Sequence, residues 1–359
     1  MRTRVRYGAV VAAVGMLLAG CGGGPGSGTV APTADGAEGH VEGGYPVAVN
    51  DCTGAATVFD AAPAKIVTSN ASSLELLLRL GAGDKVIDTG FPPGKGALPG
   101  ELDTQAQNVP VLGRSVIPKE KLLGSGADLY VDSFAAMGNM GGMGDAPTEE
   151  EFKAAGIRHI HLKSTACASM SKAPAADLSA VEQDILSLGA VTGTTGKAKE
   201  LVAGMKEKTD GVAKALGAIP DSARPTYFFF DFDAGTKQPI AVCNRQVANA
   251  VITLAGARNV FADCDADFKP VSWEDVVSRN PDWIQLGIRN RGSEEADTKA
   301  FDEARKWLEG NPATKGMKAV QAGNFLRIRS EHTTIAGVDN AATVEEIART
   351  VHPDKVKER

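Results

Sequence analysis

The sequence lacks the short motifs by which hydrolases, zinc proteases and nucleotide-binding enzymes are commonly recognised. It contains no GxSxG nucleophile elbow, no HExxH and no GxxxxGK[ST] phosphate-binding loop. It also lacks an excess of positive charge, because it has 38 Lys and Arg against 44 Asp and Glu, which gives a net charge of −6. The basic residues are scattered along the sequence and form no cluster. We therefore expect neither an enzyme nor a nucleic-acid-binding protein, and the missing nucleophile motif argues against the alternative of a secreted α/β-hydrolase-like enzyme.

No apolar run is long enough to cross a bilayer, which takes about 20 residues. Gly8–Ala19 follows the positively charged start MRTRVR, and this pattern predicts a signal peptide over residues 1–20. The segment leads into LAGC, which resembles the lipobox of bacterial lipoproteins and implies cleavage before Cys21 and lipidation of that residue. A lipidated Cys21 would anchor the protein on the extracytoplasmic side of the cell membrane. A plain secretory signal with an incidental cysteine is the alternative.

Residues 21–51 are rich in Gly, Ala and Pro and show no apolar periodicity. That composition predicts a flexible, lipidated tether between the membrane and a folded region. The chain that follows, about 300 residues, is long enough for one large domain or for two linked lobes.

Beyond the tether, short apolar runs rich in β-branched and aromatic residues alternate with helical patterns. The alternation predicts parallel α/β sheets over 52–176 and again over 218–359. Residues 177–217 interrupt it with two amphipathic patterns, the second of which would form a helix about 30 Å long. The expected fold class is therefore α/β: two Rossmann-like lobes joined by a single long rigid helix within this helical linker. A ligand cleft is expected between the lobes.

Five stretches of the sequence carry a likeness to a known family. In chain order they are PAKIVTSNASSLELLLRLGAGDKVIDTG (63–90), KEKLLGSGADLYVDS (119–133), AGARNVFAD (255–263), VSWEDVVSRNPDWIQL (271–286) and NPATKGMKAVQAGNFLRI (311–328). Together they resemble successive elements of the class III substrate-binding lipoproteins of bacterial ABC importers, the group that serves iron-siderophores, haem and cobalamin. The likeness covers roughly residues 52–352 and departs from the family pattern at Ala127, where proline is usual.

The resemblance implies a solute and a partner. A member of this family captures a small molecule outside the membrane and delivers it to a permease dimer with its ATPase. We expect a monomer that binds a ferric siderophore, with haem, cobalamin or a deazaflavin-cofactor precursor as alternatives. No resident cofactor or metal is expected, since a metal would arrive only as part of the bound chelate.

Two glutamates match the acidic residues that each lobe of the family offers to arginine pockets of the permease. They are Glu120, in PKEKLL, and Glu274, in SWEDVV. Charged contacts of this kind steer docking and fix orientation. Taken alone, each is also an exposed glutamate at a helix start, where the helix dipole favours it.

Side chains at the carboxyl ends of the predicted strands are the candidates for the cleft, because ligands bind there in open α/β sheets. In the first lobe these are Asn70, Phe91, Ser133, Phe134 and Thr165. In the second lobe they are Asp231, Phe232, Asp233, Asn244, Arg245, Arg289, Asn290, Glu331 and His332. The arginines would suit an anionic chelate and the phenylalanines a large apolar surface, but the three carboxylates leave the charge of the ligand open.

A glycine-rich run after the predicted strand DLYVD carries Met137, Met140 and Met143. Because methionine adapts to irregular apolar surfaces, we expect a flexible flap over the ligand. A loop without a role and a Cu(I) site are the alternatives, since thioethers are soft ligands. The Cu(I) alternative would make the protein an exported copper-binding lipoprotein or metallochaperone that also uses histidines.

Three histidines are available for such a site. His159 and His161 lie two residues apart on a predicted strand, so both face one side and could chelate a metal. We interpret them instead as half-buried histidines beneath a helix layer. His332, just after a strand, is the histidine best placed for the cleft.

Apart from Cys21 the chain has four cysteines, and none has the CxxC or Cys/His spacing of a zinc site. An even number in an exported chain predicts two disulfides, and four cysteines allow three connectivities. Because one pair brackets the first lobe and the other lies near strand ends of the second, we expect Cys52–Cys167 and Cys243–Cys264. A free thiol that ligates metal in the cleft is the alternative.

Overall fold

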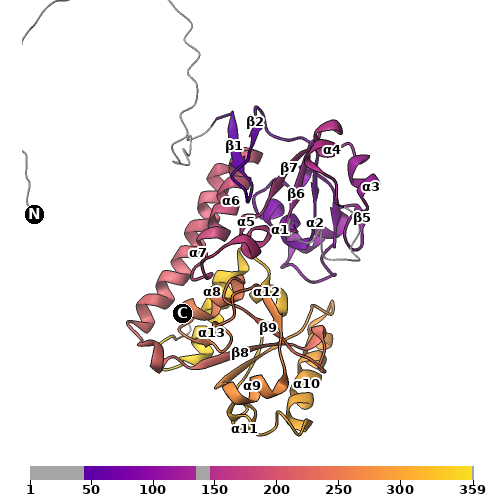
Figure 1. Cartoon of the computed structure of the whole chain (residues 1–359). Coiled ribbons are helices and arrows are strands. Elements are labelled where there is room, and N and C mark those ends of the chain that lie inside the picture. The colour runs from indigo at the N-terminus through magenta and orange to yellow at the C-terminus, as the bar shows by residue number, and fades with distance from the viewer. Residues whose placement is uncertain (1–43, 135–145, 358–359) are drawn as a thin grey trace, which may run out of the picture. The chain divides into compact units, whose positions relative to one another are not determined.

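The first lobe is built on a sheet of five parallel strands in the spatial order β5-β4-β3-β6-β7 (Figure 1). It belongs to a computed structural model that describes residues 44–134 and 146–357. The strands are β3 (Ile66–Thr68), β4 (Val86–Gly90), β5 (Val111–Gly113), β6 (Leu129–Asp132) and β7 (Arg158–His161). The helices between and after them are α1 (Ala71–Arg79), α2 (Glu101–Asn108), α3 (Lys119–Leu123), α4 (Glu149–Ala154) and α5 (Lys163–Ala166).

Local sequence explains where two of these helices begin. The side chain of Asn70 accepts a hydrogen bond from the backbone N–H of Ser73, and the hydroxyl oxygen of Ser73 accepts one from the backbone N–H of Asn70, which closes a capping box on α1. Thr148 and Glu151 form the same reciprocal arrangement at the start of α4. Each box satisfies backbone N–H groups that the first turn of a helix leaves without partners.

A hairpin precedes this sheet. Strand β1 (Val47–Asn50) pairs antiparallel with β2 (Ala56–Phe59). The tether expected over 21–51 is therefore wrong for its last residues. Contacts with distant parts of the chain hold this hairpin in place. Phe59 is fully buried, and the hydroxyl of Tyr45 donates a hydrogen bond to the carbonyl of Val191 at 2.7 Å.

The second lobe, orange to yellow in Figure 1, contains a parallel sheet in the order β10-β8-β12-β13 and a two-stranded antiparallel sheet of β9 and β11. The strands are β8 (Thr226–Asp231), β9 (Ile240–Val242), β10 (Arg258–Asn259), β11 (Phe268–Pro270), β12 (Trp283–Gly287) and β13 (Phe325–Arg327). The helices are α8 (Val247–Leu254), α9 (Trp273–Arg279), α10 (Glu294–Gly310), α11 (Lys318–Ala322), α12 (Ser330–Thr334) and α13 (Asp339–Val351).

Two helices connect the lobes. Helix α6 (Ser179–Thr192) packs against α5 and β1 of the first lobe, and α7 (Thr195–Leu216), of 22 residues, packs against α6, α8 and α13. The predicted class, two α/β lobes joined by a long helix, is confirmed. Among the described residues, no helix combines the length and apolar character needed to cross a membrane.

One continuous set of buried apolar side chains serves both lobes. It runs from Leu77 in α1 through Ile185 in α6 and Val202 in α7 to Ile347 in α13. Because these side chains contact one another without a polar break, the linking helices and both lobes share a single core. A smaller cluster around Phe230 fills the other face of the second sheet.

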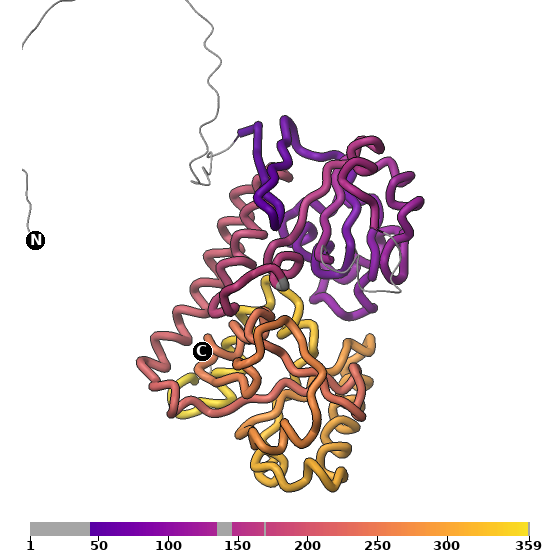
Figure 2. The backbone as a smooth tube through the Cα atoms, in the orientation of Figure 1, coloured from indigo at the N-terminus to yellow at the C-terminus, as the bar shows by residue number. Residues whose placement is uncertain are grey.

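Direct contacts between the lobes add to this core. The segment after β13, yellow in Figure 2, passes close to the first lobe. There Ser72 donates its hydroxyl hydrogen to the carbonyl of Ala336 at 2.7 Å, and Arg79 forms an ion pair with Asp339 at 2.9 Å. Helix α1 is thus bound to the second lobe by a buried hydrogen bond and a partly buried ion pair.

Candidate functional site

A cavity of about 820 Å³ lies where strand ends of the two lobes face each other. Nine of the side chains predicted for the cleft line it: Asn70, Phe91, Ser133, Phe134, Thr165, Arg289, Asn290, Glu331 and His332. They come from the chain that directly follows β3, β4, β6, β7, β12 and β13. Parallel strands bring their carboxyl ends to one edge of a sheet, which explains why residues distant in sequence meet here.

Aromatic and proline side chains form the first-lobe wall. The rings of Phe91 and Phe134 meet edge to face with centroids 5.6 Å apart. Pro92 and Pro93 continue the wall after Phe91. The backbone of Phe91 has φ +31°, and its carbonyl accepts from the N–H of Ala71 at the start of α1. The ring is therefore presented from a backbone conformation that side-chain-bearing residues rarely adopt.

This strain gives a testable expectation for stability. Phe91→Gly should be more stable than Phe91→Ala by about 1 kcal/mol, because both lose the ring but only glycine tolerates a positive φ freely. Urea unfolding of the two variants measures the difference. At Phe134, which is not among the positive-φ residues, the same pair should rank in the opposite order. Equal rankings at both positions would show that the backbone of Phe91 is not strained.

The positive charges at the cavity are already compensated. Arg289 pairs with Asp231 at 3.1 Å, and its backbone N–H donates to Asp233 at 2.6 Å. Arg329 pairs with the buried Asp297 at 2.7 Å. Guanidinium groups held in this way offer little net positive charge to a ligand.

Acidic groups also line the cavity. Burial, reinforced by the carboxylate of Asp339, raises the pKa of Glu75 against the opposing effect of Arg79. Burial likewise raises the pKa of Asp267. Oδ1 of Asp267 and Oε2 of Glu331 are buried without a hydrogen-bond partner among the described residues. The site therefore presents acceptor oxygens that suit hydrogen-bond donors or a positive charge.

Five predicted cleft residues do not line the cavity. Asp231 accepts from the side chain of Arg289, and Asp233 accepts from its backbone N–H. Phe232 packs against Phe230, with ring centroids 6.0 Å apart. The other two are Asn244 and Arg245.

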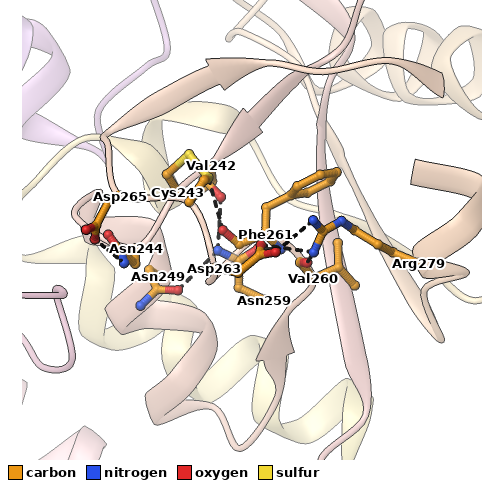
Figure 3. Close-up of a disulfide and its surroundings, with 11 residues drawn as sticks. Val242, Cys243, Asn244, Asn249, Asn259, Val260, Phe261, Asp263, Asp265 and Arg279 are labelled. Atoms are coloured by element: carbon orange, nitrogen blue, oxygen red, sulfur yellow. Dashed lines mark hydrogen bonds and ion pairs between the residues drawn. A yellow bond between two sulfur atoms is a disulfide. The ribbon is translucent and has the colours of Figure 1, made fainter. Parts of the chain in front are cut away.

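Asn244 and Arg245 turn away because β9 pairs with β11 rather than with the parallel sheet. The amide of Asn244 donates to Asp265 at 2.8 Å, beside the disulfide of Cys243 (Figure 3), and Arg245 lies 3.7 Å from the same carboxylate. The interpretation of these two residues as ligand contacts is wrong for this cavity.

Other lining residues were missed by reading strand ends alone. They are supplied by α1, by the loop after Phe91, by the start of α8, by β11 and by the segment after α12, and include Glu75, Leu98, Gln246, Phe268, Ile335 and Asp339. Phe268 is 46% exposed, although it is a large apolar side chain. An exposed aromatic at a cavity rim is available to cover a bound ligand.

The remaining predicted sites fall in different places. Met137, Met140 and Met143 lie outside the described residues, as does Cys21. Glu120 and Glu274 are exposed, and each is the second residue of its helix, α3 in the first lobe and α9 in the second.

Each lobe contains one disulfide, as predicted. Cys52 joins Cys167 with Cα atoms 5.2 Å apart, and Cys243 joins Cys264 at 5.1 Å. These four sulfurs are thus bonded in pairs, so the alternative of a free metal-ligating thiol is wrong for them. In Figure 3 the Cys243 disulfide lies beside an asparagine network, in which Asn259 donates to Asn249 at 3.1 Å.

Comparison with known proteins gives a family and a fold. A family model described as periplasmic binding protein matches residues 66–332. The chain is similar to a cobalamin-binding protein of Halobacterium salinarum, with 23% identity over 292 residues, 80% of this chain and 69% of that protein.

Two solved structures share the fold. One is a periplasmic binding protein from Veillonella parvula, with 24% identity and a TM-score of 0.72 over 87% of this chain and 100% of that one. The other is described as an ABC-type Fe3+-hydroxamate transport system from Saccharomonospora viridis, with 22% identity and a TM-score of 0.67 over 86% and 99%. Both agree with the two α/β lobes described above.

Proposed function

The chain belongs to the periplasmic binding protein family, whose members bind solutes and are not enzymes, and we propose that it is the receptor of an ABC importer for a ferric siderophore. The observation that carries the proposal is the cavity of about 820 Å³ between the lobes. Its volume lies within the range of about 300–1,000 Å³ that is usual for small-molecule sites. A single large solute with apolar surface would fill it.

The charges at the cavity favour a neutral or cationic chelate. Arg289 and Arg329 are each paired with an aspartate, and the carboxylate of Glu75 is paired with Arg79 at 2.6 Å. Asp267 and Glu331 line the same cavity, and each has a buried carboxylate oxygen without a hydrogen-bond partner among the described residues. A ferric trihydroxamate, which is neutral or positively charged, fits this arrangement. A ferric triscatecholate, which carries several negative charges, would meet like charges in a site of low polarity.

Cobalamin is the second candidate, because the similarity to a protein named for binding it extends over 80% of this chain. The corrin ring is large and carries many amide donors, which could pair with the unpartnered oxygens of Asp267 and Glu331. It would extend beyond the cavity.

The receptor would work outside the cytoplasm, attached to the membrane by lipid on Cys21. In this proposal Glu120 and Glu274 would face the permease. Their matching positions, exposed near the start of one helix in each lobe, support it. Two like charges on separate lobes fix an orientation that a single contact would not.

Thermal unfolding with defined chelates tests the ligand. Ferrioxamine B or ferrichrome should stabilise the protein by about 2.7 kcal/mol at a hundredfold excess over Kd, whereas ferric enterobactin should have no effect. Stabilisation by the triscatecholate alone would contradict the charge argument. Stabilisation by cyanocobalamin alone would favour the second candidate. If none of these ligands or haem stabilises the protein, the proposal is wrong.

A variant pair controls the experiment. Phe268→Ala should weaken binding about tenfold, since part of the roughly 1.5–3 kcal/mol gained by burying a phenylalanine would be lost. It should cost little stability without ligand, because the ring is already 46% exposed. Val111→Ala removes an equally exposed side chain, 44%, outside the cavity and should leave affinity unchanged.

A further inference from the structure

Two histidines and an aspartate meet outside the cavity, on one face of the first-lobe sheet. Asp132 is the last residue of β6, and His159 and His161 belong to the neighbouring strand β7. The register pairs Asp132 with His161, and residues two apart on a strand point to the same side. None of the three lines the cavity, although Ser133 and Phe134, which follow Asp132, do.

Their polar atoms converge. Oδ2 of Asp132 lies 3.4 Å from Nε2 of His159 and 4.0 Å from Nε2 of His161. One ligand atom from each of the three residues lies within 4.8 Å of the others. The second oxygen of Asp132 accepts from the backbone N–H of Phe134 at 2.7 Å, which fixes the carboxylate and leaves Oδ2 facing the histidines.

His159 is held in place from three sides. Its ring lies 4.4 Å from that of Phe152 and 5.5 Å from that of Tyr130. Its Nδ1 pairs with Oε1 of Glu149 at 2.7 Å. A carboxylate on the far nitrogen of a histidine is the arrangement that orients metal-bound imidazoles and raises their basicity.

The cluster also has buried polar atoms without partners. The side chain of His159 is 7% exposed, and its Nε2 has no hydrogen-bond partner among the described residues. Nδ1 of His161 is in the same situation. A bound ion is one explanation for buried ring nitrogens that lack partners.

We propose that Asp132, His159 and His161 bind one divalent transition-metal ion, with Zn²⁺ as the natural occupant and Glu149 as the group that orients His159. Ligand atoms at the usual bond lengths of about 2.0–2.1 Å in a tetrahedral site lie about 3.3 Å apart. The distance of 3.4 Å already matches, and that of 4.0 Å needs a small side-chain rotation. Imidazole and carboxylate ligands suit Zn²⁺ and its first-row neighbours.

The ion would tie the two strands to helix α4. It would connect β6 with the edge strand β7 directly, and with α4 through Glu149, the first residue of that helix. The end of β6 that it fixes is the one that presents Ser133 and Phe134 to the cavity. The site is separate from the ligand cavity, and its occupancy does not depend on which solute the cavity binds.

Metal titration of the untagged full-length protein in detergent, after treatment with a chelator, tests the proposal. Isothermal titration with ZnCl₂ should give one tight site per chain, and Co²⁺ should give the intense visible absorption of tetrahedral coordination. His161→Ala should weaken Zn²⁺ binding by 100-fold or more, and Asp132→Asn by a similar factor. Retention of wild-type affinity in both variants, or the absence of Zn²⁺ binding to the wild-type protein, would overturn the proposal.

Two matched controls locate the ion. His332→Ala removes the cavity histidine and should leave Zn²⁺ affinity unchanged, so that loss of binding in this variant would place the ion in the cavity and overturn the proposal. Glu149→Gln should weaken Zn²⁺ binding about 10- to 100-fold through the orientation of His159. Glu150→Gln, at the neighbouring exposed glutamate of α4, should not. Equal effects of the two glutamine variants would contradict the role of Glu149.

Discussion

The free energy of unfolding should fall by about 5 kcal/mol when Cys52 and Cys167 are both replaced by serine. The bond joins residues 115 apart in sequence, so its loss gives the unfolded chain a large increase in conformational entropy. Whole domains are stable by only about 5–15 kcal/mol, so a loss of this size is about a third of the stability or more. Urea unfolding followed by circular dichroism measures the change.

The second disulfide provides the matched comparison. Cys243 and Cys264 are only 21 residues apart, and their replacement by serine should cost about 3 kcal/mol. The two double variants should therefore unfold at clearly different urea concentrations, with Cys52→Ser/Cys167→Ser the weaker. If removal of the Cys243–Cys264 bond lowers the free energy of unfolding as much as removal of the Cys52–Cys167 bond, or more, loop length does not determine the contribution of these bonds.

Uptake of the ligand should fall about 100-fold when Glu120 and Glu274 are both replaced by arginine. The expectation rests on the proposed docking to a permease, in which each glutamate would meet positive charge. Like charges across such an interface cost several kcal/mol, and each 1.4 kcal/mol is about tenfold in affinity. Uptake of the labelled chelate by cells that carry the importer and this receptor measures the effect.

Ligand binding and a third glutamate serve as controls. Neither Glu120 nor Glu274 lines the cavity, so the purified variant should bind the chelate as the wild type does. Glu150→Arg reverses another exposed glutamate in the first turn of a first-lobe helix and should leave uptake unchanged. Normal uptake by the double variant would exclude these two residues from docking, and weakened chelate binding would show that the reversal acts through the fold.

Much of the first-lobe side of the cavity was predictable because its determinants are local. Ser133 and Phe91 directly follow strands whose apolar sequences are easily recognised, and parallel strands carry such residues to one edge. Arg289 in the second lobe was predictable for the same reason, because it comes shortly after the apolar strand β12. In each case a few consecutive residues decide both where the strand ends and which side chain comes next.

The errors arose where distant pairings decide the structure. Asn244 follows a strand that pairs antiparallel with β11 rather than with the main sheet, and nothing within β9 shows this. Phe268 enters the cavity through the same pairing. Strand β1 was hidden by the glycine-rich composition before it, since it forms only against β2 and α6. Partners so far away leave no local pattern to recognise.

The core shared by the two lobes has a consequence for signalling. Opening the cavity like a hinge would break the Ser72–Ala336 hydrogen bond and the Arg79–Asp339 ion pair, and would expose apolar side chains along α7 to water. The angle between the lobes is therefore a poor reporter of whether the receptor is loaded. A transporter that must distinguish the full receptor from the empty one would have to recognise the rim of the cavity itself, where the bound molecule meets the solvent.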